Sequence, residues 1–238
     1  MKFLSILFIS FFFITYSIAD DNGKPKKRLQ LRVIKHQPCN GKPSSNEKLR
    51  FPPIELAPIE PDSEKGEGCY IISGQVTVLK PMRGQVQIYS ETKYGTKTPT
   101  EKCRGADSNN CGGVGSCVYC DACNGLKNIT KKTSGLVQLE TRNGKKLDCD
   151  KGLNAGNYTD VRITFCMPTK EDFLKSQNMD EQFWNQYVSD GRLFFITLFI
   201  FNEPVNTLST RELQQIATID GEKVCGCHRL VGTVYEGN

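Results

Sequence analysis

Cysteine and histidine are the residue types in this chain whose spacing could support chemistry. Cys117, Cys120 and Cys123 are separated by two residues each, and Cys225-Gly226-Cys227-His228 follows near the carboxyl end. Thiolates and an imidazole at such spacing are ligands that tetrahedral zinc takes. In an oxidising compartment the same cysteines would instead form disulfides, and therefore the compartment decides between the two interpretations. Cys120 and Cys123 also have redox-motif spacing, but no βαβ pattern surrounds them.

Other catalytic chemistry has little support in the sequence. The two histidines, His36 and His228, lie in no motif of the serine-hydrolase, zinc-protease or P-loop type. Asp148 and Asp150 form the kind of acidic pair that glycosidases use, but nothing in the sequence places them in a cleft. We therefore expect no enzymatic activity, no catalytic residue, no cofactor and no metal.

The first nineteen residues are typical of a secretory signal peptide. An apolar run from Phe3 to Tyr16 follows Lys2, and Ser17-Ile18-Ala19 has the small residues that signal peptidase accepts. The run is shorter than the roughly 20 apolar residues of a membrane span, and two aspartates follow it. We expect cleavage after Ala19 and export of the chain, either out of the cell or to lysosomes.

Export favours disulfides over zinc. All eleven cysteines follow the predicted cleavage point, and most of them should pair in the oxidising folding compartment. Because the number is odd, one cysteine has no partner within the chain. Asn128 and Asn157 each begin a sequon that ends in threonine, and they are the predicted glycosylation sites of an exported protein.

The charge of the chain is mild and unevenly placed. A formal net charge of +5 is too small to indicate nucleic acid as a partner. Basic residues crowd the segment before Cys39, which predicts a basic amino-terminal arm over residues 20–38 with folded structure beginning near Leu29. A solvated arm, contact with an anionic membrane or matrix, and trimming after Arg28 are the three interpretations of this segment. The folded domain is expected over residues 39–238.

Segments rich in β-branched and aromatic residues, with turn residues between them, predict an all-β protein. Tyr70–Leu79 and Gly84–Tyr89 flank the turn residues 80–83, and together they predict a hairpin. The number and spacing of the segments favour an antiparallel sandwich. Short helices are expected in connections, within 171–187 and from Ser209 to Ile216. Further strands are expected over 136–140, 158–167, 193–201 and 223–235.

The run from Leu193 to Phe201 is apolar on both faces of a strand, and therefore one face must be covered by something other than water. One interpretation is a central strand in an ordinary sandwich core. The other is that the sheets splay apart and the inner face lines a lipid cup. A chain of about 15 carbons buried there would gain on the order of 10 kcal/mol before ordering costs. The residues expected to line the cup are Phe165, Phe194, Ile196, Leu198 and Ile200.

The order of several short segments resembles that of the ML lipid-recognition family. The resemblance covers about residues 39–235, and it depends on the order of the segments because no single motif is specific. The segments that carry it are Gly115-Ser116-Cys117 with Cys123 beyond it, Asn154–Tyr158, Phe165 and Pro168, Trp184 before Ser189–Arg192, Gly221–Cys227, and Leu230–Tyr235.

The resemblance implies an immunoglobulin-like β-sandwich, stapled by disulfides, whose sheets part to form a lipid cup. It implies disulfides Cys39–Cys227 and Cys123–Cys149, and a bond from Cys117 to either Cys111 or Cys103. The first bond would stabilise the fold by roughly 5 kcal/mol in the chain-entropy account, apart from native strain.

The resemblance also implies a membrane portal at the mouth of the cup, formed by Phe183, Trp184 and Tyr187. An aromatic cap on the core is the alternative role for these side chains. The chain departs from the family pattern at Cys69, Cys120, Cys166 and Cys225, which have no clear counterpart, and the span 202–220 is similar to an insertion.

These inferences predict a secreted or lysosomal carrier that extracts a glycolipid or phospholipid from a membrane and presents it to an acceptor enzyme or receptor. Contact with the membrane surface would be transient. The alternative is a cysteine-rich secreted protein whose cup has collapsed and which binds a receptor or host protein through its surface.

Overall fold

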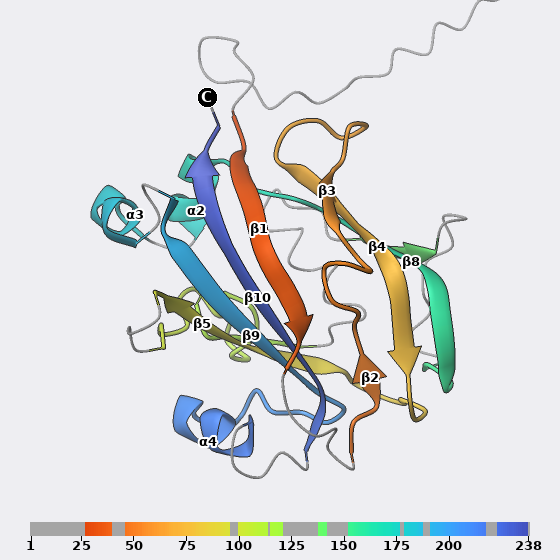
Figure 1. Cartoon of the computed structure of the whole chain (residues 1–238). Coiled ribbons are helices and arrows are strands. Elements are labelled where there is room, and N and C mark those ends of the chain that lie inside the picture. Colours follow the sequence, from red (N-terminus) through yellow and green to blue (C-terminus); the bar gives the residue numbers. More distant parts are fainter. Residues whose placement is uncertain are drawn as a thin grey trace, which may run out of the picture.

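The computed structural model describes residues 27–39, 46–95, 100–113, 115–120, 138–141, 152–176, 179–187, 191–217 and 223–237. They form two antiparallel sheets packed as a sandwich (Figure 1), as the sequence predicts. The predicted signal peptide, Asn128, Cys123 and Cys149 lie outside the described residues. Among the described residues, no helix has the length and apolar content needed to cross a membrane.

The first sheet combines strands from both halves of the chain. Its central strand is the long apolar run of the sequence, and its strand order is β1-β10-β9-β5-β6. Every pairing in it is antiparallel. In that order the strands are β1 (Leu29–Pro38), β10 (Val224–Glu236), β9 (Leu193–Phe201), β5 (Gln87–Tyr94) and β6 (Val118–Tyr119).

The second sheet has the order β2-β4-β8-β7, and the short strand β3 also pairs with β4. The helices lie in connections, as predicted. The strands are β2 (Leu49–Arg50), β3 (Ile59–Pro61), β4 (Cys69–Val78), β7 (Gln138–Thr141) and β8 (Gly156–Cys166), and the helices are α2 (Lys170–Ser176), α3 (Glu181–Tyr187) and α4 (Thr210–Gln215). Ser209 caps α4 in the predicted way, since its side chain accepts the N–H of Glu212 in a capping box.

The predicted arm over residues 20–38 is too long, but folded structure does begin near Leu29, as expected. Residues 29–38 form β1, which pairs with β10 along its whole length. Leu29 is only 2% exposed. Apolar residues at Leu29, Leu31 and Val33 alternate with polar ones, and this period of two is what a half-buried strand requires. The basic charges of this segment did not reveal that alternation.

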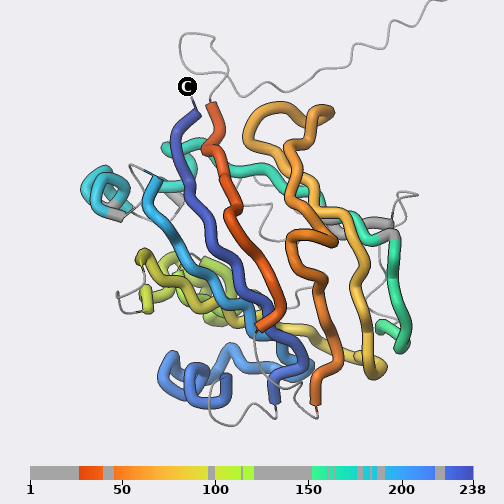
Figure 2. Tube along the Cα trace, in the orientation of Figure 1, coloured from red at the N-terminus to blue at the C-terminus, as the bar shows by residue number. Residues whose placement is uncertain are grey.

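The predicted hairpin over residues 70–89 is wrong. β4 belongs to one sheet and β5 to the other, and the chain crosses between them (Figure 2). Met82, in the connection, is 2% exposed and packs between the sheets against Val78 and Ile200. Its backbone exchanges two hydrogen bonds with Leu153, with N···O distances of 2.9 and 3.0 Å. Because the connection buries an apolar side chain, it closes one end of the sandwich and does not turn back into the same sheet.

Four disulfides connect the described strands and loops. Cys39–Cys227 joins the end of β1 to β10 across 188 residues, as predicted. Cys117 bonds to Cys103, which is one of its two predicted partners; the other, Cys111, bonds to Cys120. Cys69–Cys166 pairs β4 with β8 and was not predicted. The predicted bond Cys123–Cys149 lies outside the described residues.

The two histidines, 192 residues apart in the sequence, meet in the interior. His36 Nδ1 lies 3.0 Å from His228 Nε2, and His36 Nε2 lies 2.8 Å from the carbonyl oxygen of Ala57. Because a carbonyl only accepts, Nε2 of His36 carries the proton, its Nδ1 accepts, and His228 Nε2 donates. His228 Nδ1 is therefore an acceptor, and it is buried without a partner among the described residues.

A β-bulge aims His36 into the core. The register of β1 against β10 shifts between Val33 and Lys35, which inserts Ile34 as an extra residue. Odd-numbered residues of β1 point inward before the bulge, and even-numbered ones do so after it, because one added residue reverses the facing of a strand. As a result, Ile34 is 52% exposed while His36 is 5% exposed.

We predict that His228 makes the fold less stable in acid. Burial, and secondly the charge of His36, lower the pKa of His228 to about 4, against an ordinary value near 6.5. Between these values the unfolded chain binds the extra proton. The free energy of unfolding therefore falls as the pH is lowered from 6.5 to 4, by about 3 kcal/mol at most.

The measurement is urea denaturation at pH 7 and pH 4.5 for the unaltered protein and for His228→Gln. Glutamine keeps an N–H donor for His36 but does not titrate. The variant should lose less stability between the two pH values than the unaltered protein does, whatever its stability at pH 7. Equal losses in the two proteins would show that His228 does not titrate in this way.

Candidate functional site

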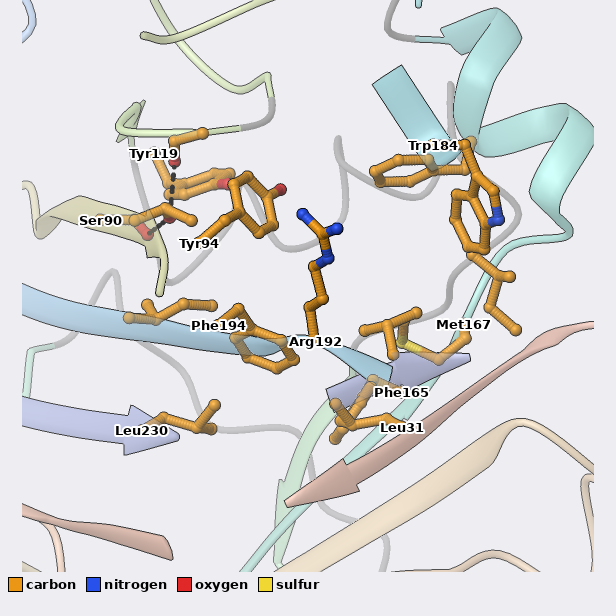
Figure 3. Close-up of a pocket in the computed structure, with 16 residues that line it drawn as sticks. Leu31, Ser90, Tyr94, Tyr119, Phe165, Met167, Trp184, Arg192, Phe194 and Leu230 are labelled. Carbon is orange, nitrogen blue, oxygen red and sulfur yellow. Dashed lines mark hydrogen bonds between the residues drawn. The ribbon is translucent and has the colours of Figure 1, made fainter. Parts of the chain in front are cut away.

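An apolar cavity of about 320 Å³ (Figure 3) lies between the sheets. It borders the first half of β9, whereas Met82 packs with Ile200 at the other end of that strand. Its walls come from the first sheet, from β8 of the second sheet and from α2 and α3. The chain termini of the described fold, the start of β1 and the end of β10, border the same end (Figure 1). The cavity therefore lies at the end of the sandwich where β1 begins and β10 ends.

Neighbouring strands in register supply the wall of the first sheet. Phe194 and Ile196 of β9 line the cavity, and Tyr94 and Thr92 of β5 lie opposite them in the strand pairing. On the other side of β9, Leu230 of β10 pairs with Ile196. Residues paired across antiparallel strands point to the same face, and therefore this wall is one continuous surface.

A tyrosine clasp joins the sheets beside the cavity. The hydroxyl of Tyr70, on β4, accepts the N–H of Leu31 at 2.6 Å and lies 3.2 Å from the side-chain oxygen of Gln30. Its ring stacks on Phe165 at a centroid distance of 5.5 Å. Both Leu31 and Phe165 line the cavity. The clasp thus holds the lining residues of β1 and β8 at a set separation.

Helices α2 and α3 cap the cavity. Trp184 is 2% exposed and packs in one cluster with Leu29 and Leu174. Phe173 meets the indole edge to face, with ring centroids 6.2 Å apart. Large aromatic side chains gain most from such burial. The cap is therefore part of the hydrophobic core, and it separates the cavity from solvent on this side.

One lysine ties the cap to the first sheet. Lys170 Nζ lies 2.9 Å from a carboxylate oxygen of Glu181 on α3 and 2.9 Å from one of Glu236 on β10. It also lies 5.3 Å from the centre of the Trp184 ring. Hydrogen bonds to Glu181 and Glu236 raise the pKa of Lys170. The ammonium therefore stays charged and holds α2, α3 and β10 together.

A disulfide-bonded loop covers the side of the cavity beside β5. Gly115 lines the cavity with a φ of +100°, and a side chain there would collide with the carbonyl oxygen of Lys102. The hydroxyl of Thr92 donates to the Gly115 carbonyl at 3.0 Å, and the Tyr119 hydroxyl donates to the Gly113 carbonyl at 3.1 Å. The loop therefore satisfies hydroxyls that would otherwise make this wall polar.

The tyrosines of the lining are neutral groups. Burial raises the pKa of Tyr119 to about 12. Burial, together with the nearby charge of Glu101, raises the pKa of Tyr94 to about 12 as well. Arg192, at the start of β9, is the one charged side chain among the described residues that line the cavity. The site thus consists of a large apolar wall with a single cation.

The structure brings together three of the five residues predicted to line a cup. Phe165, Phe194 and Ile196 line the cavity. Leu198 pairs with His228, at the level of the histidine pair, and Ile200 is packed with Met82 in the closed end. Alternation along β9 places these side chains on one face of the strand, but where the sheets close depends on Met82 and on the histidines.

Of the predicted membrane portal, only Trp184 has a described side chain. Its burial corresponds to the aromatic cap, the alternative role considered from the sequence. The side chains of Phe183 and Tyr187 lie outside the described part of the structure. Asn157, a predicted glycosylation site, is exposed on β8, and Asn128 lies outside the described residues.

Several lining residues were missed from the sequence. Leu29 and Leu31 of β1 could have been found from their alternation, but the basic charges around them suggested an arm. Met167 follows β8, Phe173 lies within α2 and Arg192 precedes β9, and no sequence pattern reports that these positions meet. Their convergence is a product of tertiary structure.

The zinc interpretation of the cysteines does not hold in the described structure. Cys117, Cys120 and Cys227 are each bonded to another cysteine, and a sulfur in a disulfide is no thiolate ligand. The described residues contain no group of three or more His, Cys, Asp or Glu side chains that could hold a metal. Cys225 is a free and buried thiol, and burial raises its pKa.

No protein-family model and no curated protein sequence matches this chain. The resemblance to the ML lipid-recognition family therefore stays a prediction from short segments.

We predict that Trp184→Ala lowers the free energy of unfolding by about 3–5 kcal/mol, because it removes a buried aromatic side chain and leaves a space that the cap fills only in part. Gln182→Ala is the matched control, since Gln182 is exposed on the same helix. Thermal and urea denaturation of both variants test this. If the two variants are equally stable, the indole is not packed as described.

Proposed function

We propose that this chain is an exported, non-enzymatic lipid-binding protein that shelters the hydrophobic part of a lipid in the cavity and transfers it between a membrane and an acceptor. The observation that carries the proposal is the cavity itself: about 320 Å³ of space with an almost wholly apolar wall under a helical cap. Ligand sites of proteins are typically cavities of this kind, with a few polar groups that fix orientation.

The energetics support binding by burial alone. A group the size of a water molecule occupies about 30 Å³, and therefore the cavity of about 320 Å³ has room for about ten methylenes. Burying ten methylenes gains about 8 kcal/mol at 0.8 kcal/mol each. Lost translational freedom and chain ordering offset part of this gain. The expected affinity is micromolar or weaker, which suits a carrier that must release its lipid.

The disulfide bonds support export of the chain. Four disulfides among the described residues are typical of a protein that folds in an oxidising compartment. Secretion from the cell and delivery to lysosomes are both compatible with it. In either place the protein would contact a membrane transiently to load or unload.

The test is native mass spectrometry of the purified glycoprotein, organic extraction of its contents, and uptake of a fluorescent single-chain lipid and a fluorescent phospholipid. We predict uptake by the unaltered protein, and a loss of tenfold or more in Ile196→Trp, which fills the cavity with a larger side chain. Thr197→Trp is the matched control, because residue 197 is next along β9 and faces the other side of the sheet.

If no lipid copurifies and neither probe is taken up, the proposal is wrong. The chain would then have to act through its surface. Equal loss of uptake in Ile196→Trp and Thr197→Trp would also contradict the proposal, since it would show that binding is unrelated to the cavity. Circular dichroism of both variants establishes that each is folded before uptake is compared.

A further inference from the structure

Arg192 and the size of the cavity together indicate which chemical class of ligand the cavity binds. Resting on the function proposed above, we propose that the cavity binds a single-chain amphiphile with an anionic oxygen headgroup, whose chain fills the apolar space and whose headgroup pairs with Arg192 at the mouth. A fatty acid carboxylate and a single-chain phosphate share this chemistry.

The volume argues for one chain. The cavity of about 320 Å³ takes about ten water-sized groups. The length of the cavity agrees with one chain, because the four residue steps from Arg192 to Ile196 span about 13 Å along a strand. Ten carbons joined by bonds of about 1.5 Å in an extended zigzag reach about 12 Å. A lipid with two long chains would need more than twice this space.

The interior beyond the cavity is filled, and therefore the chain has no deeper path along β9. Leu198, the next inward residue after Ile196, pairs with His228 of the histidine pair. Ile200 then packs with Val78 and Met82 in the closed end. The histidine pair thus sets how far a bound chain can reach.

The positive charge of Arg192 favours an anionic headgroup on the ligand. Arg192 is exposed, and its guanidinium projects from the start of β9 toward the space between Tyr94 and Trp184 (Figure 3). It donates one hydrogen bond to the carbonyl oxygen of Gln186, in the last turn of α3. A guanidinium has five N–H donors in a planar fork that matches a carboxylate or phosphate. Among the described residues, no carboxylate forms an ion pair with it.

The rest of the lining would not compete with Arg192 for the headgroup. The hydroxyls of Thr92 and Tyr119 donate to carbonyl groups of the disulfide-bonded loop. High pKa values keep Tyr94 and Tyr119 neutral at physiological pH. Among the described lining residues, a bound anion therefore meets one cation and no fixed negative charge. Because Arg192 also contacts α3, the headgroup would lie directly against the cap.

The experiment uses the full mature chain, stripped of bound lipid, and isothermal titration with decanoate, decyl phosphate, decanol and decylamine at pH 7.4. We expect decanoate or decyl phosphate to bind at least tenfold more tightly than decanol, and decylamine to bind more weakly than decanol. The order of decanoate and decyl phosphate tells a carboxylate headgroup from a phosphate one.

Arg192→Gln should reduce the affinity for the anionic ligands about tenfold and leave decanol binding unchanged. Arg229→Gln is the matched control, because it removes the same charge from an exposed position of β10 outside the lining. Arg229→Gln should bind all four ligands as the unaltered protein does. Thermal denaturation shows that both variants are folded.

The outcomes separate this inference from the proposed function. Equal binding of decanol and decanoate, or equal loss of anion binding in both arginine variants, would overturn the role of Arg192 while lipid binding stands. Uptake of a two-chain phospholipid with no binding of any decyl compound would overturn the single-chain inference alone. If no decyl compound and no phospholipid binds, the proposed function fails and this inference fails with it.

Discussion

The strand β9 is apolar on both faces, and the fold has to keep water from each of them. Phe194, Ile196 and Ile200 point into the sandwich, while Phe199 and Phe201 point to the other side. Phe201 is nonetheless fully buried. The span 202–217 returns over this outer face with Val205 and with Leu213 of α4, and β6 adds Val118 from the far edge. The span that the sequence suggested as an insertion is therefore the cover of an outer apolar face.

On the inner side of β9, the packing between the two sheets differs from one end of the strand to the other. At one end Ile200 packs with Met82 and Val78 in a closed core. In the middle is the buried histidine pair, which brings a polar layer between the sheets. At the other end Phe194 and Ile196 border the cavity. A sandwich with the same strands but a larger side chain than Thr92 or Ser90 would have little open space there.

Covalent bonds hold the segments that packing alone would hold weakly. Cys39–Cys227 ties the edge strand β1 to β10, and β1 supplies His36 to the core and Leu29 and Leu31 to the cavity. Two further bonds, Cys103–Cys117 and Cys111–Cys120, shape a glycine-rich loop that has little regular structure. That loop nevertheless has a defined role, because its carbonyl groups accept hydrogen bonds from the hydroxyls of Thr92 and Tyr119. These hydrogen bonds determine how polar the cavity wall is.

The sequence by itself determined the local structure and the class of the fold. Runs of β-branched and aromatic residues placed β9 at its observed bounds and β4, β8 and β10 within one or two residues, and the capping box placed α4, because these signals arise between residues that are neighbours in the chain. The resemblance supplied the Cys39–Cys227 bond.

What only the tertiary structure decided was which strands share a sheet, where the sheets close, and which side chains meet around the cavity. β4 and β5 look like a hairpin until Met82 is seen buried between the sheets, and His36 looks like part of an arm until a bulge turns it toward His228. These contacts include pairs as far as 192 positions apart, and their free energy depends on shape and burial, which no local pattern records.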